Sequence, residues 1–123
     1  MANSLNHCIL IGDVFGEPDI ECAGNRELVV RFTLLTENLN PGEASDRHQI
    51  VCHGHQAEAA LDCARAGHKL EVVGEITYRA SYVGFGESAR MAEIVAHRIE
   101  LLRSGPALDS AQPALLHQEQ VAA

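Results

Sequence analysis

The sequence predicts a single all-β domain, a five-stranded barrel with one short α-helix between its third and fourth strands. Segments in which apolar and polar residues alternate recur along the chain, and only one segment has helical spacing. These segments follow one another as three strands, a helix and two strands. The length of 123 residues and the hydrophobic content of 46% suit one domain with its own small core.

Three strands are predicted in the first half of the chain. Residues 7–14 are rich in β-formers, and Gly12 interrupts them where a bulge or a sharp bend would fit. Residues 28–35 alternate with a period of two, and their apolar face consists of Leu28, Val30, Phe32 and Leu34. The Asn-Pro-Gly run at 40–42 predicts a turn, after which residues 47–54 form the third strand.

The second half contains the helix and two further strands. Apolar residues recur at helical spacing within 56–66, and Gly67 is placed to end this helix as a left-handed cap. Residues 69–78 alternate again, residues 83–86 supply a hairpin turn, and 88–102 form a last long strand. A helix between strands three and four is the arrangement of the OB-fold.

The domain is expected to span residues 1–103, followed by a flexible tail at 104–123. The tail contains two prolines and mostly small or polar residues, and its apolar patch at 114–116 is too short to pack alone.

Charge argues against tight, sequence-indifferent binding to nucleic acid. Nine basic residues face seventeen acidic ones, giving a net charge of −8, and Lys69 is the only lysine. Affinity for a phosphate chain depends largely on basic side chains that displace condensed counterions. A local basic stripe on one face remains compatible with this composition.

Composition further predicts a cytoplasmic protein with reduced thiols. The sequence has no apolar run of the roughly 18 residues that a membrane span needs, and no secretory signal pattern at Met1. The four cysteines have no paired spacing; they are Cys8, Cys22, Cys52 and Cys63.

Metal and enzyme chemistry are not predicted. Cys52, His53, His55, Cys63 and His68 lie near one another in sequence, but alternation along a strand points the first two to opposite faces. No Cys-x-x-Cys or His-x-x-x-His pair exists. No phosphate-binding glycine loop or nucleophile elbow is present, so we expect neither a cofactor nor an enzyme.

Six segments carry a family resemblance that extends from Asn3 to about Gly105. They are NHCILIGDV at 6–14, EPDI at 17–20, VRFTL at 30–34, HQIV at 48–51, GHKLEVVGEI at 67–76 and AEIV at 92–95. In this order and spacing the chain resembles the bacterial single-stranded DNA-binding protein family, which is built on an OB-fold. The resemblance implies binding of single-stranded DNA in replication, repair or recombination.

The aromatic side chains on which that family stacks bases are mostly absent. Its tryptophan before the third-strand histidine is replaced by Arg47, and other aromatic positions fall on His53, on Ser81 and near Leu39. The planar guanidinium group of arginine and the imidazole ring of histidine can also stack on bases. The candidate nucleic-acid-binding residues are therefore Arg31, Arg47, His53, Tyr78, Arg79, Tyr82 and Phe85.

Structural roles compete with this interpretation. Arg47 could be a solvated strand end, and Tyr78 could continue the apolar face into the core. Phe15 could be a core residue or a loop anchor.

A second resemblance keeps another function open. GHQA at 54–57 and IELLRSG at 99–105 resemble the primosomal replication protein of the same superfamily. This implies a dimeric OB domain that acts mainly through partner proteins. The two hypotheses are a divergent, weak single-stranded DNA-binding protein and a protein-interaction module with little or no DNA binding.

Strand one also predicts a homo-oligomer. Ile9, Leu10 and Ile11 follow one another, so this strand has apolar side chains on both faces, whereas a barrel needs only one. The first resemblance implies a tetramer and the second a dimer.

Overall fold

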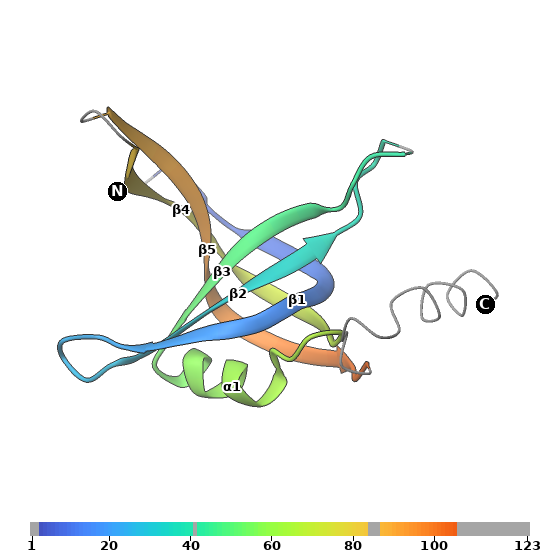
Figure 1. Cartoon of the computed structure of the whole chain (residues 1–123), viewed down its shortest axis with the longest axis horizontal. Coiled ribbons are helices and arrows are strands. Elements are labelled where there is room, and N and C mark those ends of the chain that lie inside the picture. The colour runs from blue at the N-terminus through green and yellow to red at the C-terminus, as the bar shows by residue number, and fades with distance from the viewer. Residues whose placement is uncertain (1–2, 41, 84–86, 106–123) are drawn as a thin grey trace.

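Five strands and one helix make up the protein, as the computed structural model shows for residues 3–40, 42–83 and 87–105 (Figure 1). The elements are β1 (Cys8–Cys22), β2 (Leu28–Thr36), β3 (Asp46–His53), α1 (His55–Cys63), β4 (Lys69–Val83) and β5 (Glu87–Arg103). The predicted fold class and element order are confirmed. The predicted hairpin turn at 84–86, and the predicted tail from residue 106 onward, lie outside the described residues.

The strands form a closed barrel in the order β1-β2-β3-β5-β4. All neighbours are antiparallel except β3 and β5, whose parallel pairing at Ile50↔Ile94 and Val51↔Val95 closes the barrel. Strand β1 pairs with β4 from Cys8 to Asp13 and with β2 from Asp13 to Cys22. A single long strand therefore belongs to both sides of the barrel, which explains why it must bend.

Gly12 lies where β1 comes close to β2. A Cβ atom at this position would overlap the carbonyl oxygen of Leu35, so only glycine allows β1 and β2 to approach this closely. Glycine is thus required at position 12 by a close approach and not by a bulge, because the pairing of β1 is regular there. The predicted end of the strand at residue 14 is wrong. Strand β1 continues to Cys22 across a register irregularity between Phe15 and Asp19, where Gly16 has a φ of 73°. The irregularity breaks the apolar alternation and hides the continuation in the sequence.

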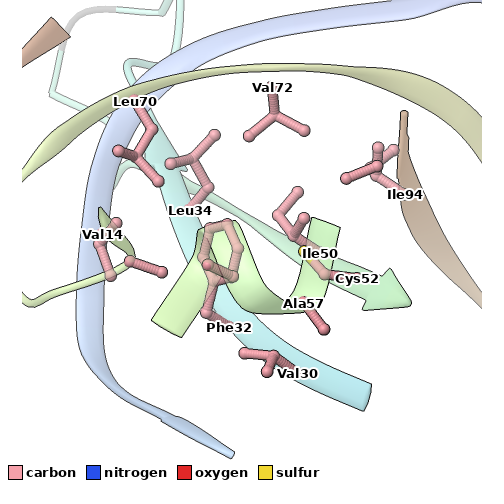
Figure 2. Close-up of a cluster of buried hydrophobic side chains, with 13 residues drawn as sticks. Val14, Val30, Phe32, Leu34, Ile50, Cys52, Ala57, Leu70, Val72 and Ile94 are labelled. Carbon is pink, nitrogen blue, oxygen red and sulfur yellow. The ribbon is translucent and has the colours of Figure 1, made fainter. Parts of the chain in front are cut away.

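The core is a cluster of aliphatic side chains around Phe32 (Figure 2). The alternation predicted for β2 is confirmed, because Val30, Phe32 and Leu34 are all buried. The helix closes one side of this cluster with small residues, namely Ala57, Ala60 and, just after its end, Ala64. Small side chains let the helix backbone lie close to the barrel.

The helix is shorter than predicted and ends differently. Its last turn is closed by the N–H of Ala64, which donates to the carbonyl of Ala60. Because Ala64 and Ala66 are both buried, the chain turns toward the barrel before it reaches Gly67. Gly67 has a φ of 89° and donates its N–H to the Val14 carbonyl at 3.0 Å, so it leads into β4 instead of capping the helix.

All four cysteines are free thiols, and they differ in exposure. Cys22 is exposed, Cys8 and Cys63 are half-buried, and Cys52 is fully buried in the core. Burial, together with the nearby Cys63, raises the pKa of the Cys52 thiol to about 12. Within the described residues, no helix is long and apolar enough to cross a membrane.

Replacing Gly12 or Gly74 by Ala should destabilise the barrel. A Cβ at Gly74 would overlap the Val95 carbonyl oxygen, just as one at Gly12 overlaps that of Leu35. We expect each change to lower the free energy of unfolding by about 1 to 3 kcal/mol or more, since backbone must move. Gly24→Ala is the control, because nothing lies within 4 Å of its Cβ position. Urea denaturation measures all three; an unchanged midpoint for Gly12→Ala would contradict the close-approach argument.

Alkaline pH should lower the stability of the folded protein, partly because it ionises the thiol of Cys52 in the unfolded state. The thiol keeps its proton in the folded state up to about pH 12, whereas the unfolded thiol ionises from about pH 9. Its contribution to stability is therefore complete below pH 9 and falls by about 1.4 kcal/mol per pH unit as the pH rises toward 12. Cys52→Ala should flatten this part of the stability profile, and Cys22→Ala should leave its slope unchanged. Equal slopes for all three proteins would refute the assignment.

Candidate nucleic-acid interface

The alternation that buries the core sends every second side chain to the outside of the barrel, which we call the outer face. Cross-strand pairing lines up one row of such residues across all five strands: Asp19, Arg31, Val51, Val95 and Glu75. Val51 is buried although it does not belong to the core cluster. Its cross-strand neighbours in this row are Arg31 and Val95.

Arg31 and Arg79 meet on this face at a shared carboxylate. Glu93 places its Oε2 atom 3.8 Å from Arg31 Nε and 3.8 Å from Arg79 Nη2. Arg31 also donates from Nη1 to Glu21, its neighbour on β1. Two of the predicted cations, from β2 and β4, are thus brought together by a residue of β5.

Arg47 lies at the start of β3 and stacks on Phe15 of β1. Its guanidinium carbon is 4.7 Å from the centre of the Phe15 ring, a distance at which cation–π attraction operates. Thr33, which pairs with both Phe15 and Gln49, lies between the two strands and accepts a hydrogen bond from Gln49 Nε2 at 3.1 Å. Arg47 is thus a stacked residue and not merely a solvated strand end.

Phe15 was not among the predicted site residues. It is neither a core residue nor a loop anchor, because it lies within β1 with 44% of its surface exposed. An exposed aromatic ring on a β-strand is a group on which a nucleic-acid base can stack. The signal that could have identified it was the continuation of β1 past Val14, which places Phe15 opposite Thr33.

His53 lies at the other end of β3 from Arg47. It has the same strand parity as Arg47, so both belong to the outer face, and its Nδ1 is 3.7 Å from Glu27 Oε2. Cys52, its neighbour, is buried on the opposite side, as strand alternation predicts. Within the part of the chain that the structure describes, no three histidine, cysteine or acidic side chains gather in a way that could hold a metal ion.

The predicted residues of the fourth strand do not lie together. Tyr78 follows the parity opposite to Arg79, so it belongs to the other side of the β4–β5 ribbon, which extends beyond the barrel (Figure 1). There it is 57% exposed and lies under the Arg90 guanidinium, 5.2 Å from its ring centre. The alternative of a core role for Tyr78 is therefore wrong. The side chain of Tyr82 and the whole of Phe85 lie outside the described residues.

The electrostatic character of the outer face follows from these pairs. Arg31 and Arg79 share the Glu93 carboxylate, and Arg31 also pairs with Glu21. His53 lies beside the carboxylate of Glu27. Arg47 contacts an aromatic ring instead. The face thus combines one exposed aromatic platform with arginines that are largely balanced by acidic neighbours. Such a surface can stack bases and contact a few phosphates.

The chain is similar to several known proteins. A solved structure of a Plasmodium falciparum SSB complex with ssDNA superposes with a TM-score of 0.66 at 26% identity, covering 85% of this chain and 98% of that one. A single-stranded DNA-binding protein of Xanthomonas campestris is 27% identical over 83% of this chain and 63% of its own length. One of Enterococcus faecalis is 29% identical over 81% of this chain and 55% of its own.

The chain therefore spans about three fifths of the length of these two relatives. A model of the single-strand binding protein family matches residues 5–102, which is most of the chain. This protein belongs to the single-strand binding protein family.

Proposed function

We propose that this protein binds single-stranded DNA through the outer face of its barrel and acts in DNA replication, repair or recombination in the cytoplasm. The observation that carries the proposal is a pair of contacts on the outside of the barrel: Arg47 stacks on Phe15, and Arg31 and Arg79 meet at Glu93. His53 also points outward, at the other end of β3 from Arg47. Apart from Glu93, these residues come from β1, β2, β3 and β4 and provide a stacking platform together with cations for the backbone. Membership of the family and the relative bound to ssDNA support the same function.

The proposed binding is weak. A stacked base contributes about 1 to 3 kcal/mol, and the described part of the outer face offers one exposed aromatic ring. Its arginines are partly neutralised by Glu21 and Glu93. Few counterions would therefore be released on binding, so the affinity should depend only shallowly on salt.

The same charge balance favours a second candidate function. A protein with a net charge of −8 and neutralised arginines also suits a protein-interaction module that binds replication or other partner proteins and little or no DNA. Binding to an oligonucleotide in low salt distinguishes the two functions.

We further propose that the protein is a homo-oligomer, either a dimer or a tetramer. On β1, Leu10 packs against the core, whereas Ile9 and Ile11 are 57% and 51% exposed on the other side. Val73 of β4 pairs directly with Ile9. An exposed aliphatic patch on a regular strand is the type of surface that a second copy covers.

Fluorescence anisotropy with labelled oligo-dT in low salt tests DNA binding. Phe15→Ala should weaken binding by about 1 to 3 kcal/mol through loss of the platform, and Arg47→Ala should reduce the salt slope by about one unit. Arg65→Ala, at an exposed site just after α1, is the control and should change neither. No detectable binding by the unaltered protein would favour the interaction module. Equal losses in all three variants would show that the outer face is not the binding surface.

Sedimentation velocity at micromolar concentration tests the oligomer. The unaltered protein should sediment as a dimer or tetramer, and the double change Ile9→Lys, Ile11→Lys should shift it to the monomer because charged side chains cannot be buried in an apolar contact. Ile20→Lys, at an equally exposed position near the other end of β1, is the matched control. A monomer in the unaltered protein would overturn this proposal.

A further inference from the structure

Glu93 is a charged side chain of the outer face that would not itself bind DNA, because a carboxylate repels phosphate. It pairs across the strands with Thr77, and its side chain is only 12% exposed. No other partner in an ion pair among the described residues is so deeply covered. Because salt screens buried charges poorly, its attraction for neighbouring cations persists in solution.

The pairing between Glu93 and its two arginines is electrostatic and is not a set of hydrogen bonds. At 3.8 Å, both contacts exceed the length of a hydrogen bond. The Arg31 Nε atom is buried and has no hydrogen-bond partner. Arg31 therefore has a donor that a better-placed acceptor could satisfy, and Glu93 Oε2 lies 3.8 Å from that donor.

Glu21 completes this arrangement on the opposite side of Arg31. It accepts a hydrogen bond from Nη1, and its own side chain is 58% exposed. Arg31 is thus held between one exposed and one covered carboxylate, whereas Arg79 is held by the covered one alone.

We propose that Glu93 competes with the phosphates of single-stranded DNA for Arg31 and Arg79, and thereby limits the affinity of the outer face. This inference rests on the proposed DNA binding. A phosphate oxygen offers a charge and hydrogen-bond acceptors that suit a guanidinium, but it must first displace the Glu93 carboxylate. Binding through this pair is an exchange of one anion for another, so it releases fewer counterions than binding to free arginines.

The experiment compares oligo-dT binding by the full chain and its variants at several salt concentrations. Glu93→Gln keeps the size of the side chain and removes its charge. It should raise the affinity about tenfold in low salt and steepen the salt slope by about one to two units, because one or two arginines become available to phosphate. Glu21→Gln, at an exposed position where folding is not at risk, should produce a smaller rise.

Two controls isolate the effect. Glu58→Gln, on α1 and 72% exposed, changes the net charge equally and should leave affinity and slope unchanged. The double variant Glu93→Gln, Arg79→Ala should lose part of the gain. Circular dichroism checks that each variant is folded.

The outcomes separate this inference from the function on which it rests. If the unaltered protein binds and neither Glu93→Gln nor Glu21→Gln binds more tightly, Glu93 positions the arginines instead of competing for them, and the inference is overturned while the function stands. If only the glutamine variants bind, the inference is supported. If no protein binds in low salt, both fail.

Discussion

The parallel pairing of β3 with β5 is the contact on which the rest of the molecule depends. It involves only Ile50↔Ile94 and Val51↔Val95, yet it converts an open sheet into a closed barrel. On the inside, Ile50 and Ile94 join the core around Phe32 (Figure 2). On the outside, the same closure brings Glu93, whose strand already pairs with the strand of Arg79, within reach of Arg31. Core residues and candidate-interface residues therefore alternate along the same strands. A shift of the strand pairing by one residue would exchange their positions.

The sequence predicted those parts of the fold that depend on local periodicity. The alternation in residues 28–35 located β2 and its buried face. What it could not show was the second half of β1, because the irregularity between Phe15 and Asp19 removes the period that identifies a strand. The end of α1 was misplaced for a similar reason. Its last turn is decided by the burial of Ala64 and Ala66, which is a tertiary effect.

The candidate interface was predictable only in part. Strand parity alone places Arg47 and His53 on one face, and the structure agrees. The separation of Tyr78 from Arg79 also follows from parity, but both were predicted as site residues from the chemistry of their side chains alone. The sharing of Glu93 by two arginines could not be read from sequence. Arg79 is near Glu93 because β4 pairs with β5, but Arg31 of β2 reaches it only because the pairing of β3 with β5 closes the barrel. Phe15 was missed together with the strand that presents it.

The charge balance of the outer face also explains how the folded barrel accommodates two neighbouring arginines. Arg31 and Arg79 approach the same atom of Glu93, so without that carboxylate two guanidinium groups would lie close together on a partly covered surface. Like charges at short range destabilise the folded state, and burial strengthens the repulsion. A fully cationic face would bind phosphate more strongly but would raise the free energy of the unbound barrel. The carboxylates of Glu21 and Glu93 relieve that repulsion while DNA is absent, and phosphate can relieve it when DNA is bound. Stability of the free protein and affinity for a polyanion are therefore opposed at this one position, and the modest affinity that we propose is the physical consequence of that opposition.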